Sequence, residues 1–255
     1  MDNRESVRER FGRAAGGYVS SPTHAAEADL ARIVAVSGAG PDAVVLDIAT
    51  GGGHTAIAMA PHVARVLATD LTPEMLGSAR EHAARRGAAN IDFAIADAED
   101  LPFADSSFDV VTCRIAAHHF PTPAAFVREV VRVLRPGGTF VFQDQIVPED
   151  STAAAVVEAF ESLRDPSHAR ALPLSEWLSM LEDGGLTVAS VDIVAKRHPL
   201  REWAALQSCA PETVDELIRI VADAPAEVGA WLEPEGWGMP EASFVNRHVI
   251  LSARR

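Results

Sequence analysis

The chain has 255 residues, 48% of them hydrophobic, so it is long enough to bury a full core in one domain. Its 22 Lys and Arg residues stand against 36 Asp and Glu residues, and the formal net charge of −14 argues against general attraction to nucleic acid or an anionic membrane. Two cysteines, Cys113 and Cys209, make no disulfide framework, and no apolar run reaches the roughly 18 residues of a membrane span. We therefore expect a cytoplasmic protein, monomer or homodimer, whose partner is a small molecule.

Two helices are predicted before the first strand. Residues 3–15 place Val7, Phe11 and Ala14 at helical spacing, which is typical of an amphipathic helix that lies over another part of the chain. Residues 29–36 continue as a second helix, which a Gly-Ala-Gly-Pro sequence ends.

A strand, a tight turn and a helix are predicted next. Residues 43–48 form a short apolar run rich in β-branched side chains, and three consecutive glycines stop it before a helical pattern begins at Ala56. Glycines at such a turn adopt backbone angles that other residues avoid, and they let a ligand lie against the main chain. Because Gly51-x-Gly53-x-x-Ala56 also fits the relaxed dinucleotide fingerprint, the turn predicts a nucleoside-cofactor site without choosing the cofactor.

Asp47 indicates which cofactor the turn binds. It lies at the end of the strand, directly before the glycine turn, where a dinucleotide would place its doubly negative pyrophosphate. A carboxylate there repels phosphate and attracts cations. S-adenosylmethionine (SAM) carries a sulfonium and an ammonium group, so the acidic strand end favours SAM.

Four further strands are predicted, each ending at a polar side chain. They span residues 64–69, 91–96, 108–113 and 139–143, and the polar residues that follow them are Asp70, Asp97, Arg114 and Asp144. Helical patterns alternate with these strands, which predicts a parallel sheet with helices on both faces and its ligands beyond the C-terminal strand ends. Asp70 follows Gly53 by 17 residues, close to the separation at which an acid after the second strand meets a ribose diol.

The second half of the chain has a different pattern. Helices are predicted over residues 156–163, 175–181 and 200–224, the last one broken at Pro211, and strands over residues 186–194 and 244–253. The complete prediction is a doubly wound, mostly parallel seven-stranded Rossmann-like α/β sheet with an antiparallel last strand and a helical cap. Residues 1–42 would cover the cofactor site, residues 43–147 would form the SAM-binding core, and residues 148–255 would add cap helices and the last two strands.

Five segments in the first 145 residues resemble class I SAM-dependent methyltransferases of the UbiE-like type, which is named for ubiquinone and menaquinone biosynthesis. They are Val45-Leu-Asp-Ile-Ala-Thr-Gly-Gly-Gly53, Ala68-Thr-Asp-Leu-Thr-Pro-Glu-Met75, Asp97-Ala-Glu-Asp-Leu-Pro-Phe103, Ser107-Phe-Asp-Val-Val111 and Arg132-Val-Leu-Arg-Pro-Gly-Gly138. Residues 113–121 and 164–168 look like a bacterial subgroup, the YcgJ-like proteins. The resemblance thins beyond residue 145 and does not carry a quinone substrate over to this chain.

The resemblance implies roles for individual residues. Asp47, Gly51 and Gly53 would line the methionyl end of SAM, and Asp70 would hold the ribose. Leu71 would pack on the adenine, while Asp97 and the main chain of Ala98 would meet its amino group. Ala49 departs from the pattern, because many relatives have glycine there, and it would narrow the approach to the backbone. Met75 and Arg114 complete the expected cofactor contacts. Tyr18, which follows the first helix, could close over the cofactor or be an ordinary packed tyrosine.

Candidate catalytic residues follow the fourth strand and lie in the cap. His118 and His119 come where an acceptor would approach the methyl group, and at most one of them should face the pocket, because adjacent side chains point different ways. His168 is the third candidate base. Each histidine has two readings, a catalytic or substrate-facing one and a structural hydrogen-bonding one.

Three other polar side chains are substrate-binding candidates. Arg164 and Arg170 could supply positive charge to an anionic or enolisable acceptor, or they could belong to a solvated helix junction. Asp144 could contact substrate or be tied to nearby backbone. No metal site is expected, because the histidines and acids lack recognisable ligand spacing and methyl transfer does not require a metal.

Three functions remain open at this point. The leading one is a SAM-dependent methyltransferase that acts on a small organic acceptor. The second is a nicotinamide-dependent oxidoreductase that uses the same glycine turn, and the third is a non-catalytic SAM-binding protein. The sequence names neither the acceptor nor its attacking atom.

Overall fold

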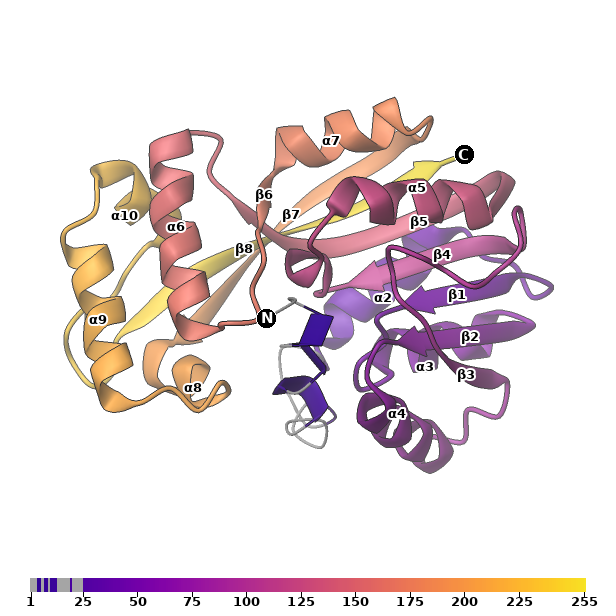
Figure 1. Cartoon of the computed structure of the whole chain (residues 1–255), viewed down its shortest axis with the longest axis horizontal. Coiled ribbons are helices and arrows are strands. Elements are labelled where there is room, and N and C mark those ends of the chain that lie inside the picture. Colours follow the sequence, from indigo (N-terminus) through magenta and orange to yellow (C-terminus); the bar gives the residue numbers. More distant parts are fainter. Residues whose placement is uncertain (1–3, 6, 9, 13–18, 20–24) are drawn as a thin grey trace.

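The molecule is built around a twisted sheet with helices on both faces, as the computed structural model in Figure 1 shows. The structure describes all residues except 1–3, 6, 9, 13–18 and 20–24. The strands of its main path are β1 Val44–Ile48, β2 Arg65–Asp70, β3 Ile91–Ile95, β4 Phe108–Arg114, β5 Leu134–Val147, β7 Thr187–Pro199 and β8 Ser243–Arg254. They lie in the order β3-β2-β1-β4-β5-β8-β7. The first five are parallel, and β8 pairs antiparallel with both β5 and β7. The predicted doubly wound fold is confirmed.

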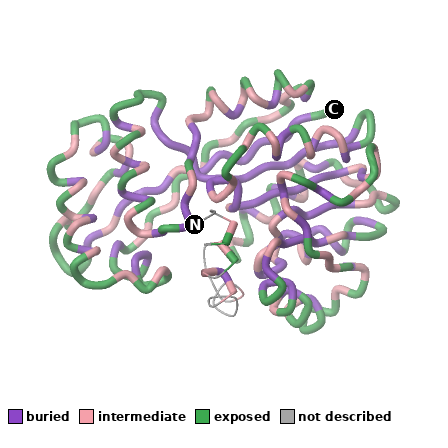
Figure 2. The backbone as a smooth tube through the Cα atoms, in the orientation of Figure 1, coloured by how far each residue is buried: buried purple, intermediate pink, exposed green. Residues whose placement is uncertain are grey.

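Helices cover the two faces of this sheet. They are α2 Glu27–Ser37, α3 His54–Met59, α4 Pro73–Arg85, α5 Pro123–Val133, α6 Ser151–Arg164, α7 Leu174–Asp183, α8 Leu200–Ala205, α9 Pro211–Ala222 and α10 Ala226–Leu232. On one face Ile33 of α2 and Met59 of α3 join the apolar side chains of β1 and β2. On the other face Phe126 of α5 and Trp177 of α7 pack against β4 and β5. The central strands β1, β4 and β5 are accordingly largely buried, whereas the edge strand β7 alternates between exposed and half-buried residues, and the outward sides of the helices are exposed (Figure 2).

The cap has an apolar cluster of its own. In Figure 1, α6, α8, α9 and α10 lie around the C-terminal end of β7 and the N-terminal end of β8. Trp203 of α8 stacks on Phe160 of α6 with ring centroids 5.1 Å apart, and Phe244 of β8 meets the edge of both rings. Because β5 and β8 run through both clusters, the cap is joined to the core by continuous sheet. The division at residues 42 and 147 stays a prediction.

The fifth strand is longer than predicted. The expected strand over 139–143 extends from Leu134 to Val147, since Leu134 pairs with Phe108 and the far end pairs with β8 and with a short strand, β6 (Leu172–Pro173). The sequence did not predict β6 or α10. No helix in the described part of the chain is long and apolar enough to cross a bilayer.

Candidate cofactor and acceptor site

The end of β1 presents a buried carboxylate. Asp47 is 1% exposed, and its two oxygens accept hydrogen bonds from the Thr112 and Thr50 hydroxyls, each at 2.6 Å. Thr112 is the residue of β4 that pairs directly with Asp47, so the parallel register places this donor. Burial raises the pKa of Asp47 to about 6, although both hydroxyls and the nearby Arg114 charge lower it. A cationic group bound beside this carboxylate would lower its pKa and favour the ionised form.

The glycine turn after β1 has left-handed backbone at three positions. Ala49, Gly51 and Gly53 have φ values of +52°, +53° and +81°. At Ala49, which has a Cβ, this conformation costs roughly 1–2 kcal/mol. A Cβ added at Gly53 would lie 3.2 Å from Cβ of Ala79, so this glycine lets α3 and α4 approach each other.

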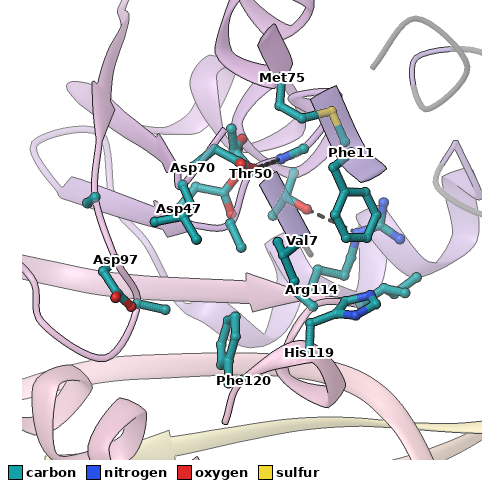
Figure 3. A pocket seen from close by; sticks show the side chains of 18 of the residues that line it. Val7, Phe11, Asp47, Thr50, Asp70, Met75, Asp97, Arg114, His119 and Phe120 are labelled. Carbon is teal, nitrogen blue, oxygen red and sulfur yellow. Dashed lines mark hydrogen bonds between the residues drawn. The ribbon is translucent and has the colours of Figure 1, made fainter. Parts of the chain in front are cut away.

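A pocket opens above these strand ends (Figure 3). Most of the predicted cofactor contacts line it, namely Asp47, Ala49, Gly51, Asp70, Leu71, Met75, Asp97, Ala98 and Arg114. His119 also lines it, whereas the other polar candidates do not, namely His118, Asp144, Arg164, His168 and Arg170. Gly53 supports the turn from outside the lining, and Tyr18 lies outside the described residues.

The acids of β2 and of the loop after β3 are held by main-chain amides. The two oxygens of Asp70 accept from the amides of Gly51 and Thr72, both at 2.9 Å, and burial raises the pKa of this carboxyl. Asp97 accepts from the amide of Glu99 at 2.9 Å. Both acids line the pocket, where a ligand can reach them.

Described helical residues near the N-terminus line the pocket as well, within the helix predicted over residues 3–15, for which no site residue was predicted. Val7 and Phe11 line the pocket, and Phe11 packs on Met75 and lies edge-on to His119 with ring centroids 4.9 Å apart. Arg4 forms an ion pair with Asp97 at 2.7 Å. The spacing of Val7 and Phe11 predicted an apolar face, and that face lines the pocket; the expectation that residues 1–42 cover a bound cofactor stays a prediction.

The two adjacent histidines have opposite environments. The His118 ring is buried beside Asp144, whose oxygens accept from its Nδ1 at 2.7 Å and from its main-chain amide at 2.9 Å. Burial alone would lower the pKa of His118, but Asp144 outweighs it and raises that pKa. His119 faces the pocket, and its Nδ1 lies 2.9 Å from the carbonyl of Ser167, which only accepts, so Nδ1 carries the hydrogen. Burial and the His118 charge hold the pKa of His119 at about 3, so its ring is neutral.

The three cap candidates are paired within the chain. Arg164 lies over the Trp203 ring, 4.0 Å from its centroid, and 3.8 Å from Glu161. His168 contacts Glu158 at 3.1 Å. Arg170 pairs with Glu176 at 2.7 Å on the surface, with more than half of its side chain exposed. Among the described residues no group of three or more His, Cys, Asp or Glu side chains could hold a metal ion.

Fold and pocket together define a class: a Rossmann-like α/β protein with a pocket at the carboxyl ends of its parallel strands, lined by acids and by the guanidinium groups of Arg4 and Arg114. Comparisons with known proteins agree. A family model described as "Methyltransferase domain" matches residues 46–142. The YcgJ methyltransferase of Bacillus subtilis (strain 168) is 39% identical over 181 residues, 71% of this chain and 72% of that protein. YafE of Escherichia coli (strain K12) is 33% identical over 201 residues, 77% of this chain and 96% of that protein.

A solved structure extends the comparison to most of the chain. The crystal structure of Bacillus subtilis YcgJ superposes with a TM-score of 0.86 at 32% identity, and covers 90% of this chain and 98% of that one. The chain belongs to the SAM-dependent methyltransferases of type 11, in the YcgJ-like group.

Proposed function

We propose that this protein binds SAM in the pocket above β1 and β2 and transfers its methyl group to a small organic acceptor that enters beside His119. The observation that carries the proposal is the charge pattern of the pocket. Asp47, Asp70 and Asp97 come from successive strand ends, and Arg114 adds a positive charge near Asp47. A pyrophosphate would meet repulsion at Asp47, whereas an amino acid with one ammonium and one carboxylate is complementary to the Asp47 and Arg114 pair.

The residues present fit this cofactor along its whole length. Asp70 would accept from the ribose hydroxyls through the lone pairs that the Gly51 and Thr72 amides leave. Asp97 would accept from the adenine amino group, with Leu71 and Met75 as apolar contacts for the ring. When bound, SAM supplies a methyl group that its sulfonium already activates for displacement.

Alignment, rather than proton removal, is the contribution we assign to the histidines. His118 donates its Nδ1 hydrogen to Asp144, which raises its pKa, and its ring is not among the described residues that line the pocket. His119 is neutral, and its Nε2 can accept a hydrogen bond from the substrate that receives the methyl group. A pKa of about 3 makes His119 a weak base, however. The site therefore suits a nucleophile that needs orientation more than deprotonation.

A radiolabelled-methyl assay tests the proposal. Wild-type protein is incubated with methyl-labelled SAM and small-molecule extracts, and label in low-molecular-weight product is counted. We expect transfer by the wild type and a reduced rate with His119→Ala at unchanged affinity for S-adenosylhomocysteine (SAH). Tight SAH binding without transfer to any extract would instead favour the non-catalytic alternative, and stabilisation by NAD or NADP alone would favour the oxidoreductase.

A further inference from the structure

A band of polar side chains crosses one face of the sheet next to the cofactor pocket. Gln145 pairs directly with His248, and Asn246 pairs with Lys196, so the side chains of each pair share a face. Gln143 lies two residues before Gln145 and points to the same side. We call these five residues the polar band. It lies between the apolar cluster that α2 and α3 form on the sheet and the apolar cluster of the cap. At this depth protein cores normally hold apolar side chains.

Two helices close over the polar band. From α2, Asp29 accepts from Gln143 at 2.8 Å and pairs with Lys196 at 2.5 Å. From α6, Glu161 accepts from Asn246 at 3.1 Å.

The polar band also continues to the wall of the cofactor pocket. Gln145 lies 3.3 Å from Nδ1 of His168. The ring centroid of His168 is 5.5 Å from that of His118, which in turn is 4.1 Å from that of His119 in the pocket lining. The rings of His168 and His118 thus connect the polar band to His119, beside which the acceptor is proposed to enter.

Several buried atoms along this surface have no hydrogen-bond partner within the described part of the chain. They are Oε1 of Gln143, Oε2 of Glu161, Nδ1 of His248, Nε of Arg164 and Nζ of Lys196, whose one polar contact among the described residues is the ion pair with Asp29. Gln143 is 0% exposed, and Glu161 and His248 are each 3% exposed, so open solvent does not satisfy them. Buried polar atoms in native proteins are nearly always paired, which makes a concentration of unpaired ones an indication of a missing ligand or of bound water.

The kinds of unpaired atom indicate the chemistry of that ligand. Gln143 and Glu161 offer acceptors, Arg164 offers a donor, and the neutral His248 ring can do either. The charges nearby already have counter-charges, since Lys196 pairs with Asp29 and the Glu161 and Arg164 side chains face each other. Hydroxyl groups both donate and accept, so they match this set without adding a charge that the chain would leave unpaired.

We propose that the polar band, with Glu161 and Arg164, is the acceptor subsite, and that it takes an uncharged small molecule carrying two or more hydroxyl groups. This inference rests on the methyl transfer proposed above. It moves away from the anionic acceptor that Arg164 and Arg170 suggested in the sequence, because Glu161 balances the charge of Arg164 and Arg170 pairs with Glu176 at the surface.

The test divides a small-molecule extract by charge. The extract is passed at neutral pH through cation and anion exchangers, and the unretained and the two retained fractions are assayed with methyl-labelled SAM. We expect label in the unretained fraction. Label confined to a retained fraction, or absent from all three, overturns the proposed acceptor class. A wild type that SAH does not stabilise would instead refute the methyltransferase proposal itself.

Two variants then locate the site. His248→Leu replaces the ring by a side chain of similar volume and removes no hydrogen bond that the described chain makes to that ring. Glu161→Gln is isosteric, and it turns the unpaired acceptor oxygen into a donor. We expect each to raise the half-saturating amount of the unretained fraction at least tenfold, with unchanged SAH affinity. Ser252→Ala removes another buried polar group of β8, bonded to Ser190, and should leave transfer unchanged. Wild-type half-saturation in both His248→Leu and Glu161→Gln overturns the proposal, since water alone would then fill the band.

Discussion

Cofactor affinity should depend on the ionisation of Asp47. Burial raises the pKa of this carboxyl to about 6, so a falling pH protonates it in the ligand-free protein. The cofactor's ammonium group favours the ionised form, so binding must remove that proton and becomes weaker below pH 6. With a pKa of about 6, the apparent dissociation constant for SAH should be about fourfold higher at pH 5.5 than at pH 7.5. Both values lie above the isoelectric point of about 5.0, which keeps the protein soluble.

Isothermal titration calorimetry with SAH at the two pH values measures this ratio. Asp47→Asn removes the ionisation while it keeps an oxygen that can accept from Thr112. We expect weaker binding by the variant at pH 7.5 and a smaller ratio between the two pH values. Asp92→Asn is the matched control, because Asp92 is exposed on β3 and pairs only with Arg65 among the described residues. Equal wild-type affinity at both pH values, or an equal ratio in Asp47→Asn, would refute the assignment of Asp47 to the ammonium group.

Three further predictions concern the turn and the pocket. Asp70→Ala should weaken SAH binding by about 1–3 kcal/mol and lower the melting temperature, because it removes the ribose acceptor and leaves the Gly51 amide unpaired; unchanged affinity by calorimetry would contradict the ribose assignment. Gly53→Ala should destabilise the fold by about 1–3 kcal/mol in denaturant titration, since it combines a φ of +81° with a close contact to Ala79, and a wild-type midpoint would disprove this. His119→Ala should slow transfer roughly 10- to 100-fold in single-turnover assays while SAH affinity stays constant, and a flat pH–rate profile between pH 6 and 8 in the wild type is expected if His119 is not a base.

The sequence predicted the strand ends because their signals are local. β1 is a run of β-branched residues that ends at glycines. The hydrophobic periodicity and the residues that break it were enough to place Asp47, Asp70 and Asp97 at the C-terminal ends of the strands. The parallel topology then brought them into one pocket. The expectation that only one of His118 and His119 faces the pocket also followed from local geometry.

What the sequence did not predict depends on contacts between distant segments. The extension of β5 follows from pairing of its residue Ile146 with Leu172 of β6 and of Gln145 with His248 of β8. The role of Arg4 depends on an ion pair with Asp97, far along the chain. No local pattern specifies such pairings, since they arise only when the whole sheet has assembled.

Calorimetry with the two competing cofactors tests the central claim most directly, namely that Asp47 selects a positively charged adenosyl compound over a pyrophosphate dinucleotide. Wild-type protein at pH 7.5 is titrated separately with SAM and with NAD and NADP. We predict saturable binding of SAM and no detectable binding of either dinucleotide, with SAM affinity reduced in Asp47→Asn. Binding of NAD or NADP that SAM does not match, and that Asp47→Asn strengthens, would contradict the account.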